Sequence, residues 1–211
     1  MQEKFVINIG RQIGSGGRTV GELIARRLGV KLYDKELINL AAEESGLSPE
    51  IFEKADEKES KGLFPTLMGY LRAPFAGDDG GCTNVLSSEA LFQIQSDVIR
   101  SVAARESCIF VGRCADYILR EHPRAVSVFI TADDACRIRR IRNRSGCTEE
   151  QARATMARID AKRAAYYNYF SSRTWGVAST YHLCLNSSVL GEEGSADLIL
   201  EFAARKLNTK F

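Results

Sequence analysis

The sequence predicts an α/β fold with a five-stranded parallel sheet that has helices on both faces. Short apolar, β-branched segments alternate along the chain with longer segments of helical periodicity. Connections of that length favour right-handed crossovers between parallel strands. The 211 residues are 45% hydrophobic and 27% charged, which is typical of globular proteins. A chain of this length buries roughly 70% of its unfolded surface, so we expect a single domain that spans residues 1–211.

Five segments have the apolar character of buried strands. The first, Lys4 to Ile9, contains the run K-F-V-I-N-I and leads directly into glycines. Val30 to Tyr33 is a short second strand. The third is C-I-F-V at 108–111, and the fourth is A-V-S-V-F-I at 125–130. Tyr181 to Leu185 completes the predicted sheet.

Helices are predicted between the strands from apolar spacing and capping residues. Apolar side chains at 20, 23, 24 and 28 form one stripe, so a helix over 19–28 should end at Gly29. Thr148 and Gln151 form a capping-box pattern for a helix that reaches about Tyr166. The other predicted helices cover 35–44, a segment from 48, 88–105, 133–144 and 196–207. Residues 56–84 fit no pattern and end in several glycines, which predicts an insertion or hinge.

Charge and cysteine content exclude several classes of protein. Lys plus Arg is 29 and Asp plus Glu is 27, so the net charge of +2 gives the whole molecule no electrostatic bias toward nucleic acid. No apolar run approaches the ~18 residues of a membrane span, and the N-terminal residues lack the pattern of a signal peptide. The six cysteines include no C-x-x-C pair. We therefore expect reduced thiols in a cytoplasmic protein without nucleic-acid or membrane partners.

A glycine-rich turn lies between the first strand and the first helix, with the sequence I-G-R-Q-I-G-S-G-G-R-T at 9–19. The backbone N–H groups of such a turn, together with a helix N-terminus, form a binding site for phosphate. The P-loop pattern G-x-x-x-x-G-K-[ST] is matched in part, with Gln12 in place of the first Gly and Arg18 in place of the Lys. A dinucleotide-binding fingerprint fits less well, because Thr19 stands where its last Gly should be.

Three segments of the chain resemble one family. The segments are R-Q-I-G-S-G-G-R at 11–18, L-Y-D-K-E-L-I at 32–38 and F-V-G-R-C-A-D at 110–116, and they are similar to motifs of the cytidylate kinase-like family of bacterial P-loop proteins. This resemblance implies a three-layer P-loop kinase fold with the strand order 2-3-1-4-5. It also implies an acceptor-binding insertion at 35–88 and a helical lid at 137–175.

The same resemblance implies a kinase that uses ATP and Mg²⁺ and acts on a small-molecule acceptor. A nucleoside monophosphate such as CMP or dCMP is the first expectation for that acceptor. The expected nucleotide-binding residues, in the glycine-rich turn and in the turn after the last strand, are Gly14, Ser15, Gly16, Gly17, Arg18, Thr19 and Ser187. The Thr19 hydroxyl would be a ligand of Mg²⁺; the other interpretation is an ordinary residue of the first helical turn.

The acceptor is expected at the carboxyl ends of the strands, where ligands bind in open α/β sheets. Arg11, Asp34 and Arg113 are the candidate acceptor-binding residues. Asp34 could orient the acceptor hydroxyl, act as a general base or hold Mg²⁺ through water, and it also fits the N-cap position of the next helix. Arg113 could face the acceptor phosphate or form a salt bridge with a neighbouring carboxylate.

Five arginines crowd residues 137–144. Phosphoryl transfer needs cations around the transferring oxygens, which favours a catalytic role for some arginines of the lid. The expected catalytic residues are Arg18, Asp34, Arg137, Arg140 and Arg163. The other interpretation of the cluster is a solvated basic face; a nucleic-acid groove is disfavoured because no aromatic residues are interleaved. The aromatic run at 166–170 indicates packing or a subunit contact in a homodimer.

Two departures from the family pattern keep other functions open. Arg18 replaces the P-loop Lys, and its planar guanidinium is not an equivalent point charge. This departure favours a nucleotide-sensing module without catalysis. The Asp that follows Gly-Arg in true cytidylate kinases is Cys114 here, which favours a kinase of a non-nucleotide metabolite. Titration with ATP and with CMP separately, followed by a turnover assay, distinguishes the three functions.

Overall fold

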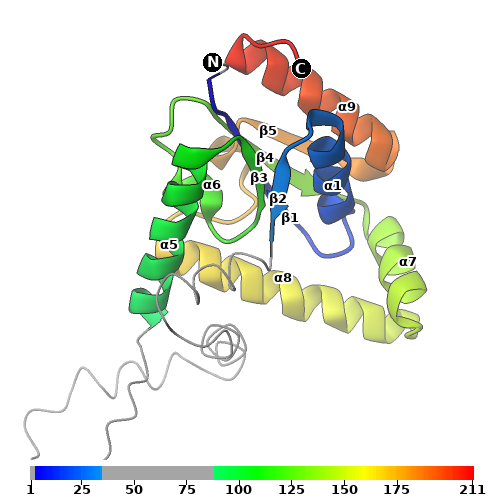
Figure 1. The fold of residues 1–211 in the computed structure, drawn as a ribbon. Helices are drawn as coiled ribbons and strands as arrows, with labels where there is room; N and C mark the ends of the chain where they lie inside the picture. Colours follow the sequence, from blue (N-terminus) through cyan, green and yellow to red (C-terminus); the bar gives the residue numbers. More distant parts are fainter. Residues whose placement is uncertain (1–2, 35–87) are drawn as a thin grey trace, which may run out of the picture. The chain divides into compact units, whose positions relative to one another are not determined.

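The computed structural model describes residues 3–34 and 88–211 (Figure 1). The chain divides into two compact units, one formed by residues 1–35 and 99–211 and the other by residues 36–98. The helices predicted at 35–44 and from 48, the hinge predicted at 56–84, and nearly all of the insertion predicted at 35–88 lie outside the described residues. The description below concerns the first unit, unless the second is named.

Five parallel strands form the sheet, in the order β2-β3-β1-β4-β5. The strands are β1 (Val6–Arg11), β2 (Lys31–Tyr33), β3 (Cys108–Val111), β4 (Ala125–Thr131) and β5 (Leu183–Asn186). β1 is central, and its Ile9 pairs with Val111 of β3 and with Val128 of β4. The predicted strands, their parallel direction and their order are confirmed, and their ends shift by only a residue or two.

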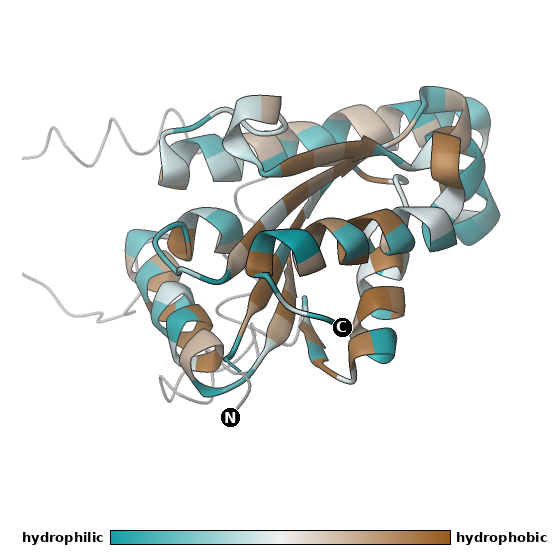
Figure 2. Ribbon diagram, turned by 90° about the horizontal axis from the view of Figure 1, so that it is seen from above, coloured by the Kyte–Doolittle hydropathy of each residue, from teal (hydrophilic) through white to brown (hydrophobic). Residues whose placement is uncertain are grey.

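Two helices cover one face of the sheet. α1 (Gly17–Leu28) and α9 (Ser187–Leu207) pack against each other and against this face (Figure 1). Their core residues are Val20, Leu23, Ile24 and Ala25 of α1, and Ala196, Ile199, Ala203 and Leu207 of α9. In Figure 2 the strands are mainly apolar, whereas the helices carry both apolar and hydrophilic residues. Burial of this apolar surface is the main favourable contribution to the stability of the fold.

The other face of the sheet carries α6 (Ala115–Ile118), which contacts β1 and β4. This helix was not predicted, because four residues are too few to show a helical period. The short 3₁₀ helix η1 (Ala178–Thr180) was not predicted for the same reason. α5 (Ser88–Arg105) agrees with the predicted helix. Its residues 99–105 belong to the first unit and 88–98 to the second.

A helical hairpin follows β4 and lies in the region predicted as the lid. It consists of α7 (Asp134–Ser145) and α8 (Glu149–Ser171). Gly146, with a φ of 65°, ends α7, and the predicted capping box of Thr148 and Gln151 begins α8. The apolar cluster between the two helices consists of Ile138, Ile141, Ala152 and Met156. Ile13 of the glycine-rich turn packs against this cluster, so the hairpin is attached to the turn.

α9 begins earlier than predicted, at Ser187 instead of residue 196. The Asn186 side chain caps it by accepting the backbone N–H of Ser188 at 2.9 Å. Gly191, with a φ of 69°, kinks the helix. Gly191 and Gly194 lower the helix propensity of this segment, which is why the sequence pattern placed the start after them.

Two further expectations concern the described part of the chain. None of its helices has the length and apolar character that a membrane span requires. None of its five cysteines is paired in a disulfide.

Candidate active site

The glycine-rich turn connects β1 directly to α1. Gly16 caps the helix with a φ of 75°, a left-handed conformation that glycine adopts without strain. The first backbone N–H groups of a helix have no intrahelical partner, and the helix dipole adds positive potential at the same place. The first turn of α1 contains no acidic residue. The loop from Gly14 to Thr19 therefore has the geometry of an anion-binding site.

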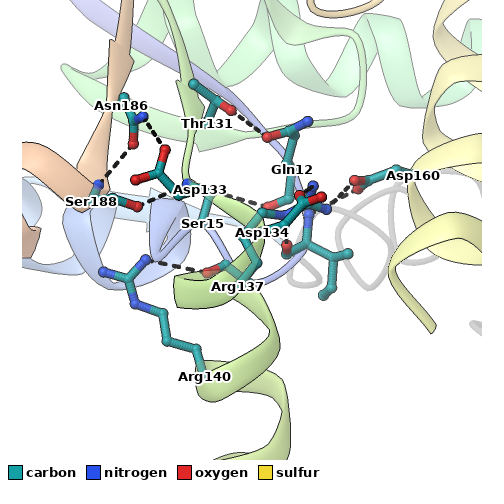
Figure 3. A network of polar contacts seen from close by, with 12 residues as sticks. Gln12, Ser15, Thr131, Asp133, Asp134, Arg137, Arg140, Asp160, Asn186 and Ser188 are labelled. Atoms are coloured by element: carbon teal, nitrogen blue, oxygen red, sulfur yellow. Dashed lines mark hydrogen bonds and ion pairs between the residues drawn. The ribbon is translucent and has the colours of Figure 1, made fainter. Parts of the chain in front are cut away.

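The helices α7 and α8 hold this loop at Ile13. The Asp160 carboxylate accepts the backbone N–H of Ile13 at 2.9 Å, and Arg137 Nε donates to the Ile13 carbonyl at 2.8 Å. Arg137 and Asp160 also form a salt bridge with each other (Figure 3). The Arg137 side chain is only 6% exposed. One buried ion pair thus binds both backbone groups of Ile13, an arrangement that we call the Ile13 clamp.

Arg140 and Ser187 contact the loop from α7 and α9. Arg140 Nη1 donates to the Gly14 carbonyl and to the Ser187 hydroxyl, both at 3.2 Å. Ser187 donates in turn to the Ser15 carbonyl at 2.6 Å. The Glu192 carboxylate lies 3.4 Å from Arg140 Nε. These contacts place one guanidinium and one carboxylate beside the loop.

Polar side chains also connect the ends of β4 and β5 next to the loop (Figure 3). The Asn186 side chain donates to the Asp133 carboxylate at 2.7 Å, and the backbone N–H of Asp133 donates to the Ser188 hydroxyl at 2.8 Å. The Thr131 hydroxyl donates to the side-chain oxygen of Gln12. The turn after β5, where the resemblance places a nucleotide contact, is thereby fixed beside the loop.

Two arginines, Arg11 and Arg18, form ion pairs with Asp34. Arg11 Nη2 lies 3.4 Å from Asp34 Oδ1, and Arg18 Nη1 lies 3.6 Å from Asp34 Oδ2. Arg18 also pairs with Glu22 at 2.9 Å. The Arg11 guanidinium approaches Gly112 so closely that a Cβ at that position would lie 1.8 Å from Nη1. Arg18, the residue predicted to replace the P-loop Lys, thus has its guanidinium beside the Asp34 carboxylate.

Several arginines influence one another at this edge of the sheet. The pKa of Arg11 is lowered to about 9, first by burial and then by the charge of Arg163, with smaller contributions from Arg113 and Arg18, while Asp34 raises it. Burial is also the main cause that lowers the pKa of Arg163. Arg163 Nη1 donates to the Arg11 carbonyl at 3.1 Å. Four guanidinium groups thus act on one another here, and a bound anion would stabilise their charged forms.

The turn after β3 has an unusual backbone. Gly112, Arg113 and Cys114 are all left-handed, with φ values of 78°, 60° and 55°. For residues other than glycine this conformation costs roughly 1–2 kcal/mol each. Backbone strain of this kind persists where the surroundings enforce it, and it is concentrated at functional sites. The turn presents Arg113 at the carboxyl end of β3 and makes the buried Cys114 the N-cap of α6.

The structure brings most of the predicted site residues to this one edge. Arg18, Arg113 and Arg163 all lie close enough to Arg11 for their charges to lower its pKa. Arg137, which was predicted as a catalytic residue of the lid, has its guanidinium buried in the Ile13 clamp. Sequence reasoning missed the roles of Asp160 and Glu192 beside the loop. No local signal could have found them, because each lies far from the loop in sequence.

Strand order, phosphate loop and helical surroundings together define a protein with the P-loop kinase fold. The cytidylate kinase-like family matches residues 6–189 of the chain. The protein belongs to this family, as the three sequence motifs predicted. A comparison with curated proteins gave no significant match.

Solved structures with a similar fold include kinases. An uncharacterized protein from Eubacterium ventriosum ATCC 27560 is 25% identical with a TM-score of 0.69, over 98% of this chain and 100% of that one. A shikimate kinase from Bacteroides thetaiotaomicron is 17% identical with a TM-score of 0.51, over 94% and 97%. A gluconokinase from Sinorhizobium meliloti 1021 is 13% identical with a TM-score of 0.52, over 98% and 96%. The two kinases support the fold alone.

Replacement of Gly16 by valine should abolish ATP binding and leave the protein folded. A β-branched residue with a φ near 75° is strained, so the loop backbone has to change; its Cβ would also lie 2.6 Å from Glu192 Oε1, and that side chain would have to shift. Calorimetric titration with ATP measures the loss. Gly29→Val is the matched control, because Gly29 also has a positive φ but a Cβ added there would meet no atom within 4 Å. Undiminished ATP affinity in Gly16→Val would remove the donor-site assignment.

Asp160→Ala should lower both the thermal stability and the ATP affinity. It removes the acceptor of the Ile13 N–H and leaves Arg137 buried without its main partner, and loss of one member of a buried ion pair costs about 3–5 kcal/mol. Asp134→Ala is the control, because Asp134 pairs with the same guanidinium at 3.4 Å but is 69% exposed. Its loss should have little effect. Equal melting temperatures for the two variants would contradict the role of the Ile13 clamp.

Proposed function

We propose that this protein is an ATP-dependent phosphotransferase whose acceptor is a nucleoside monophosphate, with CMP or dCMP as the first candidate. One observation carries the proposal: several arginines gather around Asp34 directly beside a phosphate-binding loop. Arg11 lies next to both the Asp34 cluster and the loop. Its guanidinium pairs with Asp34. Its Cβ is so close to Gly17 of the loop that a Cβ added to that glycine would lie only 2.6 Å away. Donor and acceptor phosphates would therefore meet at the carboxyl edge of β1.

The donor phosphates would lie against the backbone N–H groups of residues 14–19. Ser187, in the turn after β5, and Arg140 complete this side of the proposed site. Thr19 fits the role of a metal ligand, because it is exposed in the first turn of α1 and its hydroxyl bonds to none of the described residues. Mg²⁺ bound there would neutralise charge on the donor phosphates.

The acceptor would lie between Asp34 and the arginines at 11 and 113. Arg11 and Arg113 would bind its anionic group, since guanidinium groups match the geometry of phosphate oxygens. With a nucleoside monophosphate the attacking atom is an oxygen of its phosphate, and the Asp34 carboxylate would hold the arginines that bind this phosphate. With a hydroxyl acceptor, Asp34 would instead orient that hydroxyl or accept its proton. Its position is supported by the two arginines that pair with its two oxygens.

Catalysis would consist mainly of positioning and electrostatic stabilisation. The phosphoryl group passes through a loose transition state whose charge lies on its equatorial oxygens. Arg18 and Arg163 would stabilise that charge, and Arg140 would do so from α7 on the donor side. Arg137 would act through the Ile13 clamp, because its buried guanidinium is already bound to the Ile13 carbonyl.

A kinase of a non-nucleotide metabolite is the second candidate. Cys114 favours it, because a buried thiol takes the place of the Asp expected from the nucleotide-specific pattern. The similar fold of a shikimate kinase and a gluconokinase is compatible with this candidate. Either enzyme would work in the cytoplasm, where ATP is available and where free thiols such as those of this chain persist.

Phosphoryl transfer from ATP to a panel of acceptors tests the proposal. CMP and dCMP should be phosphorylated faster than UMP, AMP, shikimate and gluconate, with the transfer measured as ADP release and as phosphorylated product. Preference for a hydroxy acid would favour the second candidate. ATP binding without transfer to any acceptor, even with Mg²⁺ present, would support a nucleotide-sensing module and contradict both enzyme proposals.

Arg18→Ala should reduce kcat/KM far more than it reduces thermal stability. A charge-assisted contact contributes about 1.5–3 kcal/mol, which corresponds to a loss of roughly tenfold to hundredfold. Arg205→Ala is the matched control, because Arg205 has the same i,i+4 pairing, with Glu201 at 2.6 Å, on the opposite end of the chain. If Arg18→Ala retains full activity, the role of the missing Lys would pass to Arg11.

A further inference from the structure

A buried hydrogen bond joins α6 to α8. The Tyr167 hydroxyl donates to Asp116 Oδ2 at 2.7 Å, and the two residues are 4% and 8% exposed. Burial raises the pKa of Asp116, and the hydrogen bond from Tyr167 is the first of several contacts that lower it. The hydroxyl therefore helps to keep a carboxylate in a place that would otherwise disfavour its charge.

The bond lies one turn away from each of two site arginines. Asp116 stands in the first turn of α6, directly after the left-handed turn that carries Arg113. Tyr167 lies one helical turn after Arg163 on α8, and residues four apart share one face of a helix. The same bond thus connects the element that presents Arg113 with the element that presents Arg163.

Both arginines need external support in these positions. Arg113 has a left-handed backbone, which persists only where contacts around it enforce it. Burial is the main cause that lowers the pKa of the half-buried Arg163. Asp160 and Asp34 raise this pKa, and the charges of Arg137 and Arg113 lower it. Mutual repulsion would move α8 away from the turn after β3, and a hydrogen bond between α8 and α6 opposes that movement.

We propose that Asp116 and Tyr167 are positioning residues, which set the distance between Arg113 and Arg163 and thereby the affinity for the acceptor. The inference rests on the proposed function, in which these arginines serve the acceptor and the transferring group. Neither residue touches the substrate. The effect passes through the backbone of the β3–α6 turn and through one turn of α8.

Tyr181 provides a matched control for the Tyr167 hydroxyl. Its ring centroid lies 6.4 Å from that of Tyr167, and the residue is similarly buried at 8% exposure. Its buried hydroxyl makes no hydrogen bond of normal geometry with the described residues, although it lies near enough to the Tyr167 hydroxyl for each to influence the pKa of the other. Tyr181→Phe therefore removes a buried hydroxyl from the same region without breaking the link between α6 and α8.

Kinetic constants of the full-length variants give the first test. Tyr167→Phe should raise the KM for the acceptor about tenfold, equivalent to about 1.4 kcal/mol, and leave the KM for ATP unchanged. Asp116→Asn should remain close to the wild type, because its side-chain oxygen still accepts the hydroxyl of Tyr167. Tyr181→Phe should also resemble the wild type. Equal effects of Tyr167→Phe and Tyr181→Phe, or a parallel rise in both KM values, would overturn the inference.

Amide hydrogen exchange without ligands gives a second test that does not depend on activity. Exchange at residues 112–118 and 160–168 should be faster in Tyr167→Phe than in the wild type and in Tyr181→Phe. Unchanged exchange in both segments would overturn the inference. A wild-type protein that phosphorylates no acceptor would contradict the proposed function instead, and the exchange comparison would still decide whether the bond fixes the two elements.

A double variant covers the case in which Tyr167→Phe does not fold. Asp116→Leu combined with Tyr167→Phe replaces both partners with apolar groups, which is nearly neutral for stability in favourable cases. It should show the same acceptor defect and the same faster exchange as expected for Tyr167→Phe. A folded double variant with wild-type kinetics and exchange would show that the bond contributes only to packing.

Discussion

The concentration of positive charge at the carboxyl edge of the sheet is the constraint on which the rest of the site depends. Arg163, Arg113 and Arg18 all lower the pKa of the buried Arg11, and Asp34 is the carboxylate that opposes them. The arginines come from β1, α1, the turn after β3 and α8. Without a bound anion these like charges repel one another. Contacts elsewhere therefore have to hold the four elements that carry the arginines in place.

The Ile13 clamp is the principal contact of this kind on the donor side. Arg137 and Asp160 bind the carbonyl and the N–H of one loop residue, and Ile13 itself packs into the apolar cluster between α7 and α8. These contacts attach the phosphate loop to the helical hairpin, so we expect the two to move together. Closure that excludes water is a common requirement of kinases. Here any such closure has to carry the loop with the hairpin, bend the hairpin beyond the clamp, or break the two hydrogen bonds between the clamp and Ile13.

Much of the fold could be predicted because its signals are local. The apolar strands, the stripe of α1 and the capping box of Thr148 each depend on residues close in sequence. The strand order came from the family resemblance, since periodicity does not specify which strands are neighbours. α6 escaped prediction because of its length, and the early start of α9 because two glycines interrupt its pattern.

The site was predictable in its residue types but not in its contacts. Glycines and arginines at strand ends pointed to phosphate binding, and the structure places these residues at one edge. The clamp joins Asp160 to a loop residue 147 positions earlier, so only the folded chain brings them together. The left-handed conformation of Arg113 is another case. No sequence rule predicts it for arginine, because tertiary contacts impose it against the local preference.

The replacement of the P-loop lysine can be understood from the same distribution of charge. Arg18 places its charged group between Glu22 and Asp34, with half of the side chain exposed. A planar guanidinium can bind two carboxylates in separate directions, which a single ammonium point charge does less well. The cation that contacts the loop carbonyl at Gly14 is Arg140, which belongs to α7. Positive charge on the donor side is therefore contributed by the hairpin as well as the loop, and the same hairpin packs against Ile13.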